Sequence, residues 1–132
     1  MNKDRLKAII VDGDAQATVE EAETLGRDLA RQLSTSQIRN IFGSVRRIEM
    51  TWPEDPKDEA ERRQAEQAQR ELLLLKPKMA YQAKRERGRG VRTLTDVLAD
   101  AIDLVTGDRQ RFQHFVDFFE ATLAYHKAHG GN

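Results

Sequence analysis

The sequence predicts an all-α protein, a compact bundle of five or six helices with no sheet. Apolar residues recur at intervals of three and four along most of the chain, as in helices that bury one face, and no stretch alternates as a strand does. The length of 132 residues allows one ordinary domain. Leu, Ile, Val and Phe number 30, about 23%, which is enough for a modest core. We expect a single helical domain over residues 15–129.

The N-terminal segment is compatible with several structures. Its apolar cluster ends at the turn signal of residues 12–14 and fits a short strand, a helical turn or a disordered arm. We therefore assign residues 1–14 to an N-terminal arm. The first helix of the domain runs from about Ala15 to Leu33, and its buried stripe begins at Val19.

A capping motif marks the start of the second helix. Ser34 and Gln37 have the spacing of a capping box, in which each side chain bonds the backbone of the other residue. The second helix continues to about Met50. Residues 51–56 contain two prolines and cannot extend it, because proline has no N–H to donate.

Proline also divides the segment that follows. Helical spacing predicts a third helix over residues 57–75. Pro77 is expected to end or sharply kink it, since the residue before a proline avoids helical backbone angles. A short fourth helix then covers residues 78–86 and leads into a loop of alternating Arg and Gly over residues 87–90.

Two further helices complete the predicted bundle. Thr93 and Asp96 approximate a second capping box, and Gly107 suits a left-handed C-cap. The last helix covers about residues 108–128. The glycines that follow it predict a frayed C-terminus over residues 130–132.

Composition and motifs argue against catalysis. The chain has no cysteine, which excludes a thiolate nucleophile and a Cys-based zinc site, and it has no phosphate-binding glycine loop. His126 and His129 have a spacing that metal ligands use, but no acidic residue follows at the next turn. We predict no enzymatic activity, no metal and no cofactor.

The sequence contains no segment that could span a membrane. The longest apolar runs, Ala8–Val11 and Leu72–Leu75, are far shorter than the roughly 20 residues that a span requires. We therefore expect a soluble, cytoplasmic protein with no membrane partner.

Charge is balanced in total but unevenly distributed. The chain carries 22 basic and 22 acidic residues, so its net charge is zero. Two segments are basic, with net charges of +3 over residues 31–50 and +6 over residues 76–92, and each of the other three segments carries −3. The basic segments would form a positive face if the fold brought them together. The alternative is a set of solvated helix faces with mixed charge.

In the second helix, basic side chains gather opposite the apolar stripe. These are Arg39, Arg46 and Arg47, and Gly43 lies between them. A glycine inside a helix costs about 1 kcal/mol relative to alanine. Close approach of another backbone or of a phosphate would compensate for this cost. Close packing of a neighbouring helix and simple tolerance of the glycine are the alternatives.

The fourth helix places cations beside an aromatic ring. Lys78, Tyr81 and Arg85 lie at i, i+3 and i+7 and so share one face. This combination suits an RNA backbone and its exposed bases. The alternative is a Tyr81 buried in the core and flanked by the two cations. The other basic candidates for RNA contact are Lys76, Lys84, Arg87, Arg89 and Arg92.

The last helix carries two aromatic residues away from its main apolar stripe. Phe118 and Tyr125 are candidates for a protein interface, because interfaces are enriched in aromatic residues. A wide core face is the alternative. Asp96, Asp100 and Asp103 line the polar face of the preceding helix. Basic and acidic faces on one molecule allow head-to-tail association of identical copies.

Three segments resemble the signatures of one known family. Residues 33–42 resemble its N-terminal motif, T-S-Q-hydrophobic-R, and residues 75–85 resemble its middle motif, L-K-P-K-hydrophobic-x-Y-x-x-x-R. Residues 115–131 are similar to its C-terminal helix. The three segments occur in order over about residues 15–131. The chain thus resembles the small all-helical subunit of type III-A CRISPR effector complexes, the Csm small subunit.

The resemblance implies a non-catalytic scaffold of an antiviral ribonucleoprotein. Several copies would stack as a minor filament that lines the channel holding guide RNA and target RNA, in contact with the other subunits of the complex. The matched positions that would face RNA are Arg39, Lys76, Lys78, Tyr81 and Arg85. Arg46 and Arg47 are added by their helix face alone, and residues 87–92 by composition alone.

Two other functions fit the residues. A protein–protein adaptor would use its arginines only for solubility. A sequence-specific DNA binder would use residues 34–50 as a recognition helix, but the glycine-containing tight turn that precedes such a helix is missing.

Overall fold

The structure is a computed structural model that describes residues 1–86 and 88–132. Within these residues it contains only helices, so the predicted all-α class is confirmed. None of these helices combines the length and the apolar character needed to cross a bilayer. The helices are α1 (Lys3–Ile10), α2 (Ala15–Leu29), α3 (Thr35–Thr51), α4 (Glu59–Arg85), α5 (Arg89–Val105) and α6 (Arg109–Ala128).

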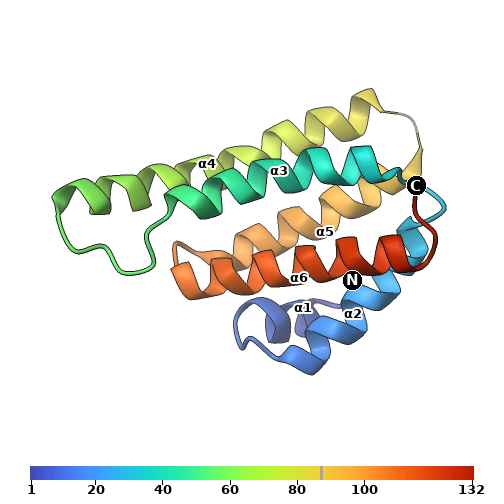
Figure 1. Cartoon of the computed structure of the whole chain (residues 1–132), viewed down its shortest axis with the longest axis horizontal. Coiled ribbons are helices and arrows are strands. Elements are labelled where there is room, and N and C mark those ends of the chain that lie inside the picture. Colours follow the sequence, from blue (N-terminus) through green and yellow to red (C-terminus); the bar gives the residue numbers. More distant parts are fainter. Residues whose placement is uncertain (87) are drawn as a thin grey trace.

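The six helices form three layers of two (Figure 1). α3 and α4 make up one outer layer, α5 and α6 the middle layer, and α1 and α2 the other outer layer. α6 contacts α1, α2, α3 and α5, so it is the central helix of the bundle. The first turns of α4 extend past the other helices at one end, and no residue of the segment 53–64 is buried.

Aromatic side chains fill the space around α6. The ring of Phe112 stacks on that of Trp52 with centroids 4.8 Å apart, and Phe119 meets Phe42 edge-on at 5.0 Å. Such pairs add to the stabilisation that comes from burying apolar area. Four phenylalanines of α6 are fully buried: Phe112, Phe115, Phe118 and Phe119.

The burial of Phe118 corrects the prediction that it lies at a protein interface. Its side chain is inside the core of its own chain and is not available to a partner. The alternative, a wide core face, applies because neighbouring helices surround α6 on several sides. Tyr125, the second interface candidate, is partly buried against the same core.

α2 and α6 approach each other closely at Gly26. A Cβ atom at this glycine would lie 2.7 Å from the Cβ of Tyr125 and 2.8 Å from the carbonyl oxygen of Thr122. The buried face of α2 includes Ala22, Leu25, Gly26 and Leu29, whereas Val19, expected in the buried stripe, is 48% exposed.

The N-terminal segment is an α-helix that belongs to the core. Asn2 caps α1, and its Oδ1 accepts a hydrogen bond from the backbone N of Asp4 at 2.7 Å. Leu6, Ile9 and Ile10 are buried, and α1 contacts α2, α5 and α6. Of the structures left open for residues 1–14, the helical one is therefore present, and these residues do not form a separate arm.

Arg5 joins α1 to α2 through two carboxylates. Its Nη2 donates to Glu20 Oε1 at 2.7 Å, and its Nε donates to Glu21 Oε1 at 3.2 Å. The hydrogen bond from Arg5, followed by one from Gln16, lowers the pKa of Glu20 below its usual value. The contact therefore stabilises the fold above the ordinary carboxylate pKa, and this contribution is lost as the pH falls through the lowered pKa.

Helix α4 continues through Pro77, so the predicted end of a helix at this residue is wrong. The predicted third and fourth helices are one helix of 27 residues. Leu75 and Met79, on either side of the proline, are both buried and keep the two halves of α4 on the core. Pro77 itself is exposed, so its ring meets solvent rather than a neighbouring helix.

One predicted capping box is present and the other is not. Ser34 Oγ accepts from the backbone N of Gln37 at 3.1 Å, and Gln37 Oε1 accepts from the backbone N of Ser34 at 2.9 Å. α5 begins at Arg89, upstream of Thr93, and has no side-chain cap. Gly107 has a φ of 75°, the left-handed conformation expected at the end of α5.

The C-terminal residues lie against the bundle, in contrast to the fraying expected for residues 130–132. The backbone N of Gly131 donates to the carbonyl oxygen of His126 at 2.8 Å, and Gly131 is buried. The carbonyl oxygen of Asn132 accepts from the backbone N of Thr35. The chain end thus helps to hold the first turn of α3.

Two glycine variants test the contact between α2 and α6. We expect Gly26→Ala to lower the free energy of unfolding by about 1–3 kcal/mol, because the new methyl group would overlap backbone atoms of α6. Gly43→Ala is the matched control. In the described part of the chain, the nearest atom to a Cβ at Gly43 is Arg47 Nη1 at 3.9 Å, so this variant should gain up to about 1 kcal/mol from helix propensity. Thermal unfolding followed by circular dichroism measures the stability of both variants. If both variants gained or both lost stability, the close contact of α2 and α6 at Gly26 would be contradicted.

Two proline variants test the continuity of α4. Pro77→Ala should raise the free energy of unfolding, by up to about 3 kcal/mol, because alanine restores an N–H donor and removes the clash of the ring with the preceding turn. Pro56→Ala, in the loop before α4, should instead lower it by about 0.4–1 kcal/mol, because the unfolded chain becomes freer. Urea unfolding measures both values. A Pro77→Ala variant less stable than the wild type would contradict the cost that we assign to a proline inside α4.

Candidate nucleic-acid interface

α3 and α4 run antiparallel beside each other, and a groove lies between their outer faces (Figure 1). Its volume is about 390 Å³. α3 contributes Arg39, Asn40, Gly43, Ser44 and Arg47 to its lining, and α4 contributes Lys78, Tyr81, Gln82 and Arg85. We call this feature the α3–α4 groove.

The α3–α4 groove brings the two basic segments of the sequence together. Four of its lining residues are cationic, and none of the described residues that line it is acidic. Five of the eleven residues predicted to contact RNA meet here: Arg39, Arg47, Lys78, Tyr81 and Arg85. A positive potential can persist in such a groove although the whole chain is neutral.

The apolar stripes of the two helices direct these side chains outward. On α3, Ile41 and Val45 are buried, which leaves Gly43 and Arg47 on the opposite side. On α4, the buried Leu75 and Met79 have the same effect on Lys78, Tyr81 and Arg85. The positions of the cations thus follow from the burial of the apolar faces.

Tyr81 is an exposed ring at the edge of the groove. Its side chain is 67% exposed, which excludes the alternative of a core tyrosine. The Cζ atom of Arg85 lies 5.8 Å from the ring centroid, in cation–π range. An open aromatic surface is therefore present beside the cations.

The sequence reasoning did not identify Ser44 as part of the groove. Its Oγ accepts a hydrogen bond from Arg47 Nη2 at 3.1 Å, which restricts the guanidinium at the groove wall. The only signal in the sequence was the three-residue spacing between the two side chains, which puts them on the same helix face.

Two predicted residues are paired with acidic groups outside the α3–α4 groove. Arg46 Nη1 lies 2.5 Å from Glu49 Oε1, and Lys76 Nζ lies 2.5 Å from Asp103 Oδ1 of α5. In each pair the carboxylate neutralises the charge of the cation. Neither residue lines the α3–α4 groove.

Three of the remaining basic candidates lie in α4 and α5. Lys84 and Arg92 line a second cleft, of about 550 Å³, between α4 and α5. Asp96 also lines this cleft and lies 4.0 Å from Arg92, so the lining has mixed charge. Arg89 is exposed in the first turn of α5, and Arg87 lies outside the described residues.

The two C-terminal histidines do not converge on a common point. His126 is fully buried, and its Nε2 donates to the carbonyl oxygen of Leu33 at 2.6 Å. His129 lies 3.8 Å from a carboxylate oxygen of Glu23. Among the described residues, no three His, Cys, Asp or Glu side chains form a group suited to a metal ion.

Fold and groove together define a small, helical protein with a cationic groove between α3 and α4. The chain matches the family Csm2 Type III-A over residues 12–132, and it therefore belongs to that family. The protein is thus a subunit of the type III-A CRISPR complex, as its three sequence motifs indicated. Searches of curated proteins and of solved structures found no match to this chain.

Two aromatic variants distinguish the groove from the core. Tyr81→Ala should change the free energy of unfolding by no more than about 0.5 kcal/mol, because the exposed ring contributes little to packing. Phe118→Ala should lower it by about 3–5 kcal/mol, because the substitution leaves a cavity beside α6. Chemical denaturation measures both. Equal losses would mean that Tyr81 is part of the core after all.

Proposed function

We propose that this subunit contacts guide RNA and target RNA through the α3–α4 groove and catalyses no reaction. The supporting observation is that Arg39, Arg47, Lys78 and Arg85 gather in one groove of a molecule with zero net charge. Arginine suits phosphate because its planar guanidinium donates two parallel hydrogen bonds and stays charged. The groove would therefore hold the RNA backbone.

The contact would be independent of RNA sequence. In an RNA-guided complex, base pairing between guide and target carries the sequence information. A subunit beside that pairing needs only phosphate, ribose and shape. Four of the nine residues that line the groove are cations on long side chains, and this lining fits such a role.

In our proposal, several copies stack head-to-tail as a minor filament of the cytoplasmic, antiviral complex. The balance of 22 basic and 22 acidic residues supports this, since copies with a large net charge would repel one another. Stacking would repeat the groove along the RNA. Weak contacts that are repeated on one strand reinforce each other through effective concentration.

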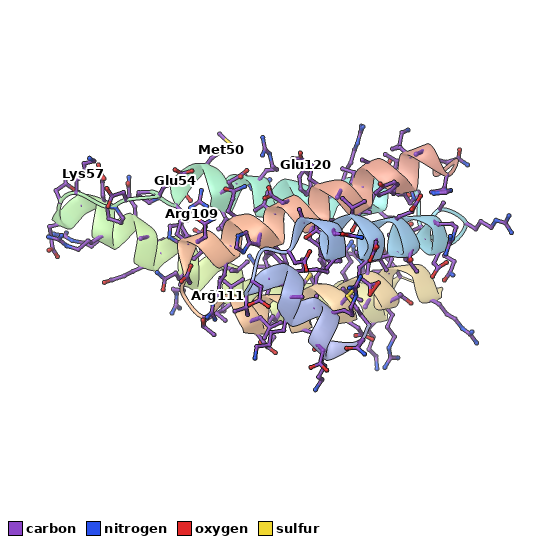
Figure 2. All side chains as sticks on the ribbon, turned by 90° about the horizontal axis from the view of Figure 1, so that it is seen from below. Met50, Glu54, Lys57, Arg109, Arg111 and Glu120 are labelled. Atoms are coloured by element: carbon purple, nitrogen blue, oxygen red, sulfur yellow. The ribbon has the colours of Figure 1, made fainter. Side chains whose placement is uncertain are left out.

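The second candidate function is a helical adaptor that binds proteins and has no direct contact with RNA. Exposed apolar side chains of α3 and α4 favour it: Met50 is 81% exposed, and Leu73 and Leu74 are 57% and 42% exposed. Met50 points away from the bundle (Figure 2). An adaptor would use these side chains and leave the groove cations in solvent.

Charge-reversal variants separate the two functions. Arg39→Glu and Arg85→Glu should each weaken binding to single-stranded RNA, because each replaces a cation of the groove. Arg63→Glu is the matched control, an exposed arginine of α4 outside the groove. Fluorescence anisotropy with a labelled RNA measures the affinity over a range of salt concentrations.

The salt dependence gives the number of phosphate contacts. With four contacts, the logarithm of the wild-type affinity should fall with the logarithm of salt concentration at a slope of about −3, and each groove variant should reduce this slope by about 0.7. The control should keep the wild-type slope. If the groove variants bind RNA with the affinity of the control, or if the affinity of the wild type does not depend on salt concentration, the adaptor is the correct function.

A further inference from the structure

We infer that the α3–α4 groove holds a single unstacked nucleotide, with its base on the ring of Tyr81 and its ribose–phosphate over Gly43. The inference rests on the proposed RNA contact and goes further, because it specifies an unpaired nucleotide. Paired bases are stacked inside a helix and cannot reach an aromatic side chain on the protein. An extruded base can lie on one.

Gly43 is the first observation, because the chain itself gives no reason for a glycine there. Among the described residues, the one atom within 4 Å of a Cβ at this position would be Arg47 Nη1, at 3.9 Å, and the backbone is helical. The other glycines differ. Gly26, Gly90 and Gly131 are crowded by neighbouring atoms of the chain, and the remaining four have positive φ. Gly43 thus combines the cost of a helical glycine with an open position that faces the groove.

An open glycine in a cationic groove suits the close approach of a ligand backbone. Without a side chain at Gly43, a ribose or phosphate can come up to the surface of the helix between Arg47 and Lys78. A methyl group at this position would hold the ligand farther from the helix.

Tyr81 is the second, independent observation. Its ring is 67% exposed, so a flat, electron-rich surface is available to a ligand, and the guanidinium of Arg85 lies over the ring in cation–π range. Nucleic-acid bases stack on such rings regardless of their identity. Asn40 and Gln82 line the same groove and offer amide donors and acceptors to a ribose or a base edge.

Size does not distinguish this groove, but its lining does. At about 390 Å³ it lies within the range of pockets that hold small ligands, as does the cleft of about 550 Å³ between α4 and α5. That second cleft has no aromatic lining residue and includes Asp96, which would repel a phosphate. The combination of ring, open glycine and cations occurs in the α3–α4 groove.

The test compares two single-stranded oligoribonucleotides of equal length, one complete and one with abasic riboses at its central positions. Both carry the same phosphates, so they differ only in the bases available for stacking. The full-length protein should bind the complete RNA about tenfold more tightly than the abasic RNA. Tyr81→Ala should lose this preference, and Tyr81→Phe should keep it because the ring remains. The salt slope should stay the same in both variants.

Gly43→Ala tests the backbone position. The variant should bind both RNAs several-fold more weakly than the wild type, although it is the variant expected to gain thermal stability. Opposite effects on binding and on stability exclude a folding defect as the cause. Wild-type affinity of Gly43→Ala for both RNAs would overturn this part of the inference.

The outcomes separate this inference from the proposed function. If the wild type binds both RNAs equally while Arg39→Glu still weakens binding, the RNA contact stands and the stacked nucleotide is wrong. If Tyr81→Ala keeps the preference for the complete RNA, the ring is not the platform. If the wild type binds neither RNA, the proposed function fails, and the inference fails with it.

Discussion

The burial of α6 is the constraint on which the rest of the structure depends. Its four phenylalanines are fully buried and each contributes roughly 1.5–3 kcal/mol by leaving water. α1, α2, α3 and α5 all pack on this helix. Because α3 buries its isoleucines and valine against the core, its arginines face solvent. α4 packs beside α3 and likewise buries its apolar face and exposes its cations. The groove is thus a consequence of the core.

Several features of the α3–α4 layer reduce stability. Four cations share one groove, Gly43 weakens the middle of α3, and Pro77 interrupts the hydrogen bonding of α4. Natural sequences break local rules of this kind mainly at functional sites, where the rest of the fold offsets the cost. By contrast, Arg46 and Lys76 lie just outside the groove and have carboxylate partners, as cations with a structural role do. The distinction between the two groups supports a ligand role for the groove.

Local patterns were sufficient to predict the helices that carry their own signals. The capping box of Ser34 and the apolar periodicity of α3 act within a few residues, so the sequence alone predicted both. Pro77 was misjudged because its local cost of about 3 kcal/mol is offset by the burial of Leu75 and Met79 against distant helices. Phe118 was misjudged for a similar reason, since the width of a buried face depends on how many helices surround it.

Local patterns were also insufficient to predict all of the candidate site. Helix geometry predicted that Arg39, Lys78 and Arg85 point outward, but it could not decide between Arg46 and Arg47, which are adjacent and both lie off the apolar stripe. The partner of Lys76 is 27 residues away in sequence, and no local pattern reveals it.

Zero net charge and a cationic groove are compatible because electrostatic interactions in salt solution are short-ranged. At physiological ionic strength, exposed charges separated by more than about 8 Å are largely screened from each other. The acidic residues that balance the groove include Glu20, Glu23 and Glu59, on α2 and on the projecting end of α4. An RNA backbone in the groove would therefore interact with the cations beside it, while at a distance the molecule attracts nucleic acid only weakly. In the stacked assembly that we propose, this combination favours RNA held along a row of grooves over RNA bound by a free subunit.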